Sequence, residues 1–559
     1  MCGILGGNKF ESIDNIQYGL SSIVHRGMDN NTIFSFDNRM YLSHNRLSIQ
    51  DLHEVANQPM VSDDSRYYLV FNGELWKSSF DKFDKKLRKL YNFKTEKSDT
   101  ELLLYYLIHN IENIGRSLRE LDGMFAFSLY DKQTDTTYLG RDFIGRMPLY
   151  YHYDGERFGF CSEAKGLLVG CDTPYYKIDV KSKYHKMADV KDKETIYPVL
   201  PGHIITFKPH PFIHNSYDME EEVWYTFKDN YDKDNQSYYT RDEEQFRHFE
   251  SEDKGLDYYI DGFRDVLNDA VDNELISDVP VCTILSGGID STIITWLLSK
   301  KLPNIEAFVV NVNPIRKSKY KDDLYYARMA AKEFGIKLHE VNVDREDIEK
   351  RLSESIWASE TFKWTQVSPA VAQLFLAEEI QKQGFKVVFG GEGADEIFAS
   401  YGDVKRFCWN EPLHWHQKRV NLLNGLHKSN LVRTNKSMMY GGTVELRTPF
   451  LNKEVIDFGL RIPTKYRDEN YEERKNFEYK TSEYSDGNIM KFILRKAFEK
   501  NISEELLWRP KKTFQVGCHT DYLKNEEVDM YKIFGELFKD GKGYEKFFKK
   551  RLDIDVINV

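Results

Sequence analysis

Residues 280–298 read PVCTILSGGIDSTIITWLL, and this stretch decides the fold of the second half of the chain. The apolar run over 280–285 predicts a buried strand, and the spacing over 293–298 predicts a helix. Between them, residues 286–292 form a turn rich in Gly and Ser, which presents backbone N–H groups and a helix N-terminus to phosphate. No Gly-Lys-Ser/Thr follows, so this is not the phosphate loop of kinases and GTPases.

A second glycine-rich turn follows another apolar run. Residues 387–389 (VVF) predict a buried strand that ends in 390–396 (GGEGADE). Glycines let the backbone approach a nucleotide, and the carboxylates suit Mg²⁺ and proton transfer. The strand expected over 306–310 and the helix expected over 324–334 add the alternation that predicts a parallel sheet. Such sheets bind ligands at the carboxyl ends of their strands, where both turns lie.

The first half opens on Met1-Cys2-Gly3. Removal of Met1 would leave Cys2 with a thiol and a free α-amine. The α-amine has a pKa of about 8, so at neutral pH it can take the proton of the thiol. Position 2 is therefore a candidate nucleophile, and the residues downstream support this interpretation.

A possible oxyanion hole follows the strand expected over 67–71, at Asn72-Gly73. An Asn amide and a Gly backbone N–H at a strand end can stabilise a tetrahedral oxyanion, and Gly permits close approach. Arg46 offers a bidentate donor for an α-carboxylate, and Asp99, with Glu74 close to Asn72, could accept an α-ammonium. Together they predict a pocket for glutamine, formed by Arg46, Leu47, Ser48, Ile49, Asn72, Gly73, Glu74 and Asp99.

These motifs resemble, in the same order, the class II glutamine amidotransferase domain. The segments that carry the resemblance are 2–4 (CGI), 25–27 (HRG), 46–49 (RLSI), 72–74 (NGE), 98–99 (SD), 122–127 (DGMFAF) and 140–142 (GRD). The resemblance implies an N-terminal-nucleophile fold, with two antiparallel sheets sandwiched between helices. Met28 stands where the family usually has Pro, which alters the loop without removing a chemical group.

The turn at 286–292 resembles the loop of enzymes that cleave ATP to AMP and pyrophosphate. Together with 444–451 (VELRTPFL) and 508–511 (WRPK), it makes the chain similar to glutamine-hydrolysing asparagine synthetases up to about residue 520. The implied fold is a two-domain α/β protein, an αββα sandwich followed by a parallel-sheet adenine-nucleotide-binding domain with extra helices. The expected parts are residues 2–210 (glutaminase), 211–255 (charged linker), 256–525 (ATP-pyrophosphatase) and 526–559 (C-terminal tail).

The resemblance also implies roles for individual residues. Ammonia released at Cys2 would travel through an internal tunnel to an adenylated carboxylate. There Glu392 would act as base and Lys511 would stabilise pyrophosphate, while Val310 and Gly391 would contact adenosine through their backbone. The expected ATP site comprises Ile284, Leu285, Ser286, Gly287, Gly288, Asp290, Ser291, Val310, Gly390 and Gly391, with Mg²⁺ held by Asp290 and Asp395.

The acceptor carboxylate is less well determined by the sequence. Asparagine synthetases usually carry a segment resembling ETYDVTTIRAS, whereas residues 360–370 read ETFKWTQVSPA. Lys363 thus replaces an acid and Ser368 replaces an Arg, and the loss of a guanidinium is not a neutral change. Residues 514–517 (FQVG) also depart from the usual FSDG. Glu392 matches asparagine synthetases, whereas the related β-lactam synthetases carry Tyr there, and this favours aspartate.

Two alternatives stay open at this point, an acceptor other than aspartate and a non-catalytic regulator that binds glutamine or nucleotide. The intact Cys2, Asn72, Glu392 and 286–292 turn argue against the regulator. The net charge of −11 argues against nucleic acid as a partner. No apolar run is long enough to span a membrane. Six cysteines without a CxxC pair indicate reduced thiols and a cytoplasmic protein. The chain could also assemble as a homodimer, which the sequence does not decide.

Overall fold

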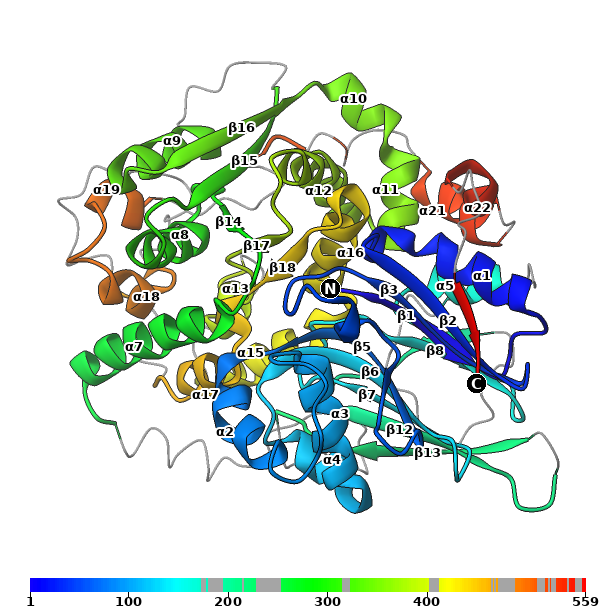
Figure 1. The fold of residues 1–559 in the computed structure, drawn as a ribbon. Coiled ribbons are helices and arrows are strands. Elements are labelled where there is room, and N and C mark those ends of the chain that lie inside the picture. The colour runs from blue at the N-terminus through cyan, green and yellow to red at the C-terminus, as the bar shows by residue number, and fades with distance from the viewer. Residues whose placement is uncertain are drawn as a thin grey trace.

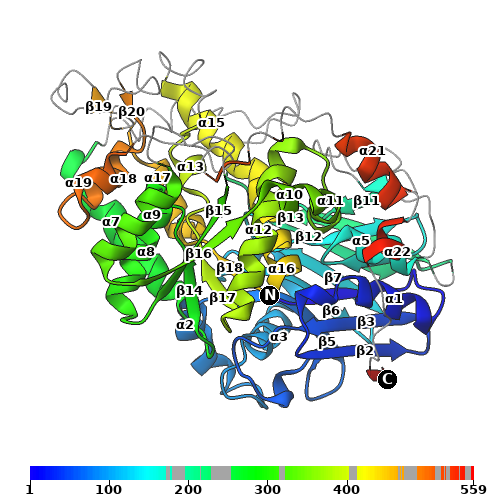
Figure 2. The ribbon, with the colours of Figure 1, turned by 90° about the horizontal axis from the view of Figure 1, so that it is seen from above.

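The computed structural model describes residues 1–171, 177–178, 195–213, 216–227, 253–313, 322–401, 412–463, 466, 469–470, 488–509, 518–520, 523, 529–539, 542–547 and 555–559. Within these residues the chain forms two side-by-side parts, an N-terminal pair of sheets and a C-terminal parallel sheet (Figures 1 and 2).

In the described residues of the N-terminal part, two mostly antiparallel sheets face each other. The eight-stranded sheet has the order β10 (Lys177–Ile178), β11 (Thr195–Pro198), β8 (Tyr150–Tyr153), β9 (Phe158–Cys161), β1 (Gly3–Gly7), β3 (Met40–Arg46), β2 (Asn30–Phe36) and β21 (Asp555–Asn558). The six-stranded sheet has the order β13 (Tyr217–Val223), β12 (His203–Pro209), β7 (Thr136–Arg141), β6 (Gly123–Asp131), β5 (Tyr67–Leu75) and β4 (Met60–Val61).

Helices cover the outer faces of both sheets (Figure 1). Those on the eight-stranded sheet are α1 (Ile13–Ser22) and α5 (Ala164–Gly170). Those on the six-stranded sheet are α2 (Lys77–Leu87), α3 (Asp99–His109) and α4 (Ile114–Leu118). The resulting αββα order is the N-terminal-nucleophile sandwich expected from the sequence.

Strand β5 shows how the sequence builds these layers. Tyr68 and Val70 pack between the sheets, in the same core as Ile4 of β1. Leu69 and Phe71 pack instead with the apolar side chains of α2, α3 and α4. Because successive side chains of a strand point to opposite faces, a continuous apolar run serves a strand buried on both sides.

The second part contains a parallel sheet, as the alternation of strands and helices predicts. Its order is β16 (Lys337–Val343), β15 (Glu306–Val312), β14 (Val281–Ile284), β17 (Val387–Phe389) and β18 (Glu445–Arg447). From β14 the chain continues to β15 and then β16 on one side of the sheet. From β17 it continues to β18 on the other side. The order therefore reverses between β14 and β17, and a reversal of this kind opens a ligand-binding crevice at the carboxyl ends of the strands. The turns at 286–292 and 390–396 begin there.

Helices surround this sheet, and those predicted over 293–298 and 324–334 are confirmed as α8 and α9. Their bounds are α7 (Leu256–Glu274), α8 (Ile289–Lys301), α9 (Asp323–Phe334), α10 (Arg345–Lys350), α11 (Leu352–Ser359), α12 (Trp364–Lys382), α13 (Ala394–Ile397), α15 (Pro412–Gly425), α16 (Asn430–Gly442), α17 (Lys453–Leu460), α18 (Phe492–Ala497) and α19 (Glu504–Leu507). A short two-stranded sheet pairs β19 (Glu469–Asn470) with β20 (Asn488–Ile489).

The segment 526–559, expected as a tail, is folded in its described parts. It forms α21 (Met530–Phe534), α22 (Lys542–Phe547) and the strand β21, which pairs in parallel with β2. The Val559 N–H donates to the Ser35 carbonyl at 2.8 Å. The end of the chain thus returns to the N-terminal part and covers the β2 edge (Figure 1). Sequence reasoning missed this strand because it is short and lies far from its partner in the chain.

Ending the chain at residue 554 should destabilise the N-terminal part, because the truncation removes the backbone pairing of β21 and exposes β2. Each hydrogen bond contributes about 0.5–1.5 kcal/mol, so we expect a loss of about 2–4 kcal/mol. Calorimetry should show a lower midpoint temperature for the first unfolding transition. Light scattering should show more aggregation, because the β2 edge is exposed. Ile557→Thr, which keeps the backbone pairing, should unfold like the unaltered protein. Equal unfolding temperatures for the truncated and full-length chains would contradict this prediction.

Candidate active sites

The structure brings Cys2 and Asn72 together, as the sequence predicted. The Cys2 backbone N–H donates to Asn72 Oδ1 at 2.9 Å, and the thiol lies 3.8 Å from the Leu47 carbonyl. Within the described residues, the buried Asn72 Nδ2 has no hydrogen-bond partner. An unsatisfied buried amide is costly, and its position beside a nucleophile fits a donor that is reserved for a developing oxyanion.

Gly73 occupies a position that no other residue fits. Its φ is +152°, and a Cβ there would lie 2.0 Å from the Met124 carbonyl oxygen of β6. The glycine therefore allows β5 and β6 to approach directly beside Asn72.

Arg46 organises the loop that passes over Cys2. Its guanidinium donates to the His53 carbonyl at 2.9 Å and to Asn57 Oδ1 at 2.6 Å, and it also contacts the Asp51 carbonyl. Several of its N–H groups thus hold the loop in shape, and only the remaining ones are available to the α-carboxylate expected from the sequence. The Ser48 N–H donates to Asp29 at 2.7 Å.

Glu74 and Asp99 form an acidic pair beside the oxyanion site. Burial raises the pKa of both, that of Asp99 to about 6, and nearby carboxylates add to the effect. Asp99 accepts the Leu75 N–H at 3.1 Å, and Glu74 accepts from the Gln50 amide and lies 3.9 Å from Arg447. A bound ammonium would favour the charged form of both carboxylates.

The N-terminus itself lies at the boundary between the two parts. The Met1 ammonium pairs with Glu445 Oε2 of β18 at 2.7 Å, and both groups are fully buried. Burial raises the pKa of the Cys2 thiol, and the neighbouring terminal ammonium opposes that rise. The nucleophile of the first part is therefore adjacent to a strand of the second.

In the second part, the turn after β14 is tightly packed around its glycines. Gly287 has φ +70°, and a Cβ there would lie 2.5 Å from the Asp323 carbonyl oxygen. Ser286 and Ser291 face each other, with their hydroxyls 3.0 Å apart. A Cβ on Gly391 would lie 2.8 Å from the Ser291 nitrogen, so the two glycine-rich turns are in contact. The remaining predicted ATP residues Ile284, Leu285, Gly288, Val310 and Gly390 lie on or directly after strands β14, β15 and β17.

Lys491 joins Asp290 to Asp395, the two carboxylates expected to hold Mg²⁺. Its ammonium lies 2.5 Å from Asp290 Oδ2 and 2.6 Å from Asp395 Oδ1, and its side chain is 1% exposed. Two carboxylates beside a phosphate loop fit the usual coordination of Mg²⁺, which takes further ligands from substrate phosphates. Sequence reasoning missed Lys491 because a lysine that precedes a short apolar helix carries no recognisable spacing signal.

Glu392 lies at the same crevice, where burial raises its pKa and the Arg433 guanidinium of α16 opposes the rise. Arg433 donates to Thr434 Oγ1 at 2.9 Å and to Asn430 Oδ1 at 3.2 Å. Lys511, and residues 514–517 with it, lie outside the described residues.

The two altered positions of the 360–370 segment have different environments. Lys363 is exposed at the start of α12. Ser368 is fully buried, and its hydroxyl lies 3.3 Å from the Thr520 carbonyl and 3.1 Å from the Thr520 hydroxyl. Glu360 accepts backbone N–H groups at the start of α5 and pairs with Lys436, so it connects the two parts.

Comparisons with known proteins agree with this arrangement. Residues 1–218 match the family model of the glutamine amidotransferase domain, and residues 262–418 and 410–544 match that of asparagine synthase. The chain is 29% identical to asparagine synthetase B [glutamine-hydrolyzing] of Escherichia coli strain K12, over 89% of this chain and 78% of that protein.

Two further relatives have similar coverage. A probable asparagine synthetase [glutamine-hydrolyzing] of Schizosaccharomyces pombe is 30% identical, over 94% of this chain and 86% of that protein. The asparagine synthetase [glutamine-hydrolyzing] of Homo sapiens is 27% identical, over 92% and 84% respectively. A solved glutamine phosphoribosylpyrophosphate amidotransferase from B. subtilis covers 57% of this chain and 69% of its own, with 17% identity and a TM-score of 0.30, too low to support an inference.

Replacing Asp99 by Asn should weaken glutamine binding by about tenfold or more, because a buried charge-assisted contact to the α-ammonium is lost. In the unaltered protein, the KM for glutamine should rise as the pH falls below about 6, where Asp99 takes up a proton. In Asp99→Asn the KM should already be high, and the acidic limb should be smaller, because only Glu74 is left to take up a proton. Initial rates of glutamate formation across about pH 5 to 8 test this expectation.

The matched control is Glu96→Gln, which removes an exposed carboxylate from the same loop. It should keep the KM and the pH profile of the unaltered protein. An Asp99→Asn variant with an unchanged KM at neutral pH would show that Asp99 does not hold the ammonium.

Proposed function

The chain belongs to the family of glutamine-hydrolysing asparagine synthetases, and we propose that it converts aspartate to asparagine with glutamine as nitrogen donor and ATP as energy source. The observation that carries this proposal is Asn72 beside Cys2, with an Nδ2 that has no hydrogen-bond partner among the described residues, in the same chain as a glycine-rich turn whose Asp290 is joined to Asp395 through Lys491. We assign residues 2–210 to glutamine hydrolysis and 256–525 to ATP-dependent synthesis, with 211–255 joining them.

In the glutaminase half, we propose that Met1 is removed and that the freed α-amine of Cys2 takes the proton of the thiol. The thiolate attacks the carboxamide carbon, and the oxyanion accepts hydrogen bonds from Asn72 Nδ2 and the Gly73 N–H. The α-ammonium gives its proton to the amide nitrogen, and the tetrahedral intermediate then expels ammonia and leaves a glutamyl thioester. Water hydrolyses the thioester to glutamate and regenerates the thiol. Glu445 keeps a buried partner without Met1, because Arg447 lies 2.7 Å away.

In the synthetase half, the side-chain carboxylate of aspartate attacks the α-phosphorus of ATP, which gives an acyl-adenylate and pyrophosphate. Backbone and hydroxyl donors of the 286–291 turn bind the departing phosphates, and Lys491 adds a positive charge beside them. Asp290 and Asp395 would hold a Mg²⁺ that neutralises phosphate charge. We assign Lys511 to the pyrophosphate from the family resemblance alone.

Glu392 then accepts a proton as ammonia attacks the adenylate carbonyl, and AMP leaves with its bonding electron pair. Desolvation has raised the pKa of Glu392, which suits a carboxylate that must accept a proton. Ammonia would reach this carbonyl through the boundary between the two parts, where Cys2 lies near Glu445.

We also propose a cytoplasmic location and leave assembly as a homodimer to experiment. Among the described residues, Cys2, Cys161, Cys171, Cys282 and Cys518 are free thiols, which is usual in a reducing compartment. No helix within the described residues has the length and apolar character needed to cross a membrane.

Replacing Cys2 by Ala should lower glutamine-dependent synthesis at least about a thousandfold, because no other thiol is proposed to attack glutamine. Synthesis from added ammonium chloride should persist, since the second site uses ammonia directly. Cys171→Ala, a partly buried cysteine of the same half, should retain both activities. Equal loss of both activities in Cys2→Ala would contradict the two-site mechanism.

Aspartate should stimulate pyrophosphate release from ATP and yield asparagine, with AMP as the second nucleotide product. The turn lacks the lysine of kinase loops, so ADP and phosphate are not expected. A screen of carboxylic acids for pyrophosphate release, with mass spectrometry of the amide, tests the acceptor. If a different carboxylate stimulates release and aspartate does not, the buried Ser368 becomes the first position to examine.

A further inference from the structure

The loop that carries the predicted glutamine-binding residues is held by a carboxylate from the other half of the protein. Asp278 lies between α7 and β14, yet its backbone N–H donates to the Ile49 carbonyl at 2.9 Å. Its side chain accepts the Asp51 N–H at 2.9 Å and pairs with Lys97 at 2.6 Å. One residue of the synthetase half therefore makes three contacts with the segments on either side of the glutamine site.

These contacts lie next to residues that position the two acidic groups of the predicted glutamine site. Ile49 and Asp51 flank Gln50, whose amide donates to Glu74. Lys97 lies two residues before Asp99, at the start of the helix that presents this carboxylate. Displacement of the loop would therefore move both acidic groups that we assign to the glutamine ammonium.

The contacts within the loop do not replace those made by Asp278. Asp51 has a left-handed backbone, with φ +50°, and Arg46 holds its carbonyl. The Asp51 N–H, however, is directed to Asp278. A further link to the second half runs through Asp29, which accepts the Ser48 N–H and pairs with Lys386 at 2.8 Å.

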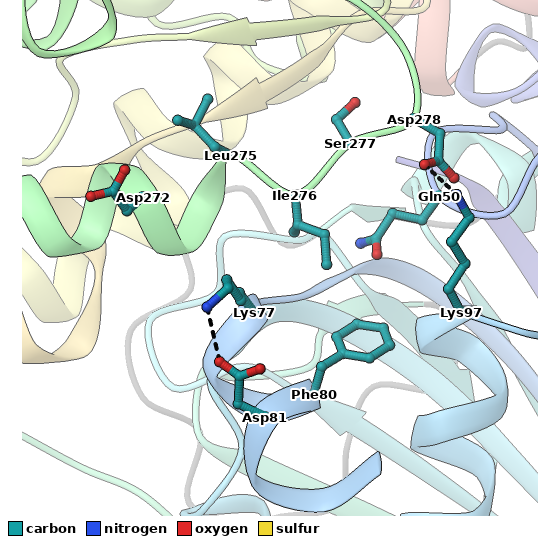
Figure 3. A pocket seen from close by; sticks show the side chains of 10 residues that line it. All are labelled: Gln50, Lys77, Phe80, Asp81, Lys97, Asp272, Leu275, Ile276, Ser277 and Asp278. Carbon is teal, nitrogen blue, oxygen red and sulfur yellow. Dashed lines mark hydrogen bonds and ion pairs between the residues drawn. The ribbon is translucent and has the colours of Figure 1, made fainter. Parts of the chain in front are cut away.

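A pocket between the two halves lies directly beside these contacts (Figure 3). The cavity measures about 490 Å³ and is lined by Gln50 and Lys97 on one side and by Ile276 and Asp278 on the other. In Figure 3, the Lys97 and Asp278 side chains meet at its edge, next to Gln50. Lys97 is 54% exposed there, so its ion pair is weak on its own. The rest of the link consists of the Asp278 backbone N–H, which donates to the Ile49 carbonyl, and the Asp278 carboxylate, which accepts the part-buried Asp51 N–H.

We propose that Asp278 is a positioning residue through which the synthetase half holds the glutamine-binding loop in its working conformation. The inference rests on the proposed function, because it assigns that loop to glutamine. Asp278 also stands three residues before β14, the strand that ends in the phosphate turn. The glutamine loop is thus tied to the base of the ATP site rather than to its own domain alone.

The test compares Asp278→Ala, Asp278→Asn and a control, Asp272→Ala, in the full-length protein. Asp272 lines the same pocket, but it pairs with Lys301 of its own half at 2.6 Å and does not contact the glutamine loop. For each variant, the KM and kcat for glutamine hydrolysis and the rate of ammonia-dependent synthesis are measured.

We expect Asp278→Ala to raise the KM for glutamine about tenfold, the effect of losing one or two hydrogen bonds. Asp278→Asn keeps an oxygen that can accept the Asp51 N–H, so its KM should rise less, by about threefold. The kcat for hydrolysis at saturating glutamine and the ammonia-dependent rate should stay within about twofold in all variants. Asp272→Ala should match the unaltered protein throughout.

A KM in Asp278→Ala that equals that of the unaltered protein would overturn the inference. So would a parallel loss of ammonia-dependent synthesis, because that would indicate a general structural role. If the unaltered protein itself fails to hydrolyse glutamine, the proposed function is overturned first, whatever the variants do.

Discussion

The burial of the N-terminus is the constraint on which the rest of the structure depends. A nucleophile that uses its own α-amine must be the first residue of a chain, yet chain ends are normally mobile. Here β1 begins directly after Cys2 and lies between β3 and β9 in the sheet, so the terminus is fixed from its first residues. Asn72 from the opposing sheet and the loop after β3 then converge on it, and the αββα sandwich supplies both.

The same constraint brings the two halves into contact through buried charges. Arg146 of the first half pairs with Glu274 of the second, and Lys165 of the first half pairs with Glu360 of the second; each of these side chains is at most 2% exposed. Burying a pair is no guarantee of stability, but removing one partner costs about 3–5 kcal/mol because the other charge is left alone. Any other relative placement of the halves would leave buried charges unpaired, at a large cost in free energy. The pairs therefore select this arrangement more than they add to its stability.

Most of the architecture could be predicted from local signals, and the parts that could not depend on long-range contacts. The apolar run before Asn72 and the strand–turn–helix at 280–298 gave correct strands and turns, because hydrophobic spacing and glycines act within a few residues. The roles of Lys491 and Asp278 depend on partners 96 to 229 positions away, for example Lys491 with Asp395 and Asp278 with Ile49. No spacing rule reaches that far, and β21 escaped prediction for the same reason.

The charge balance of the synthetase site explains why its parts must act together. Among the described residues, Lys491 bridges the carboxylates of Asp290 and Asp395, so ATP would bring its phosphates close to both carboxylates. Asp290 and Asp395 would hold a divalent cation there, whose charge would offset the repulsion between these carboxylates and the phosphates. The ion pairs of Lys491 keep the carboxylates of Asp290 and Asp395 together at the 286–292 turn, where we propose that ATP binds.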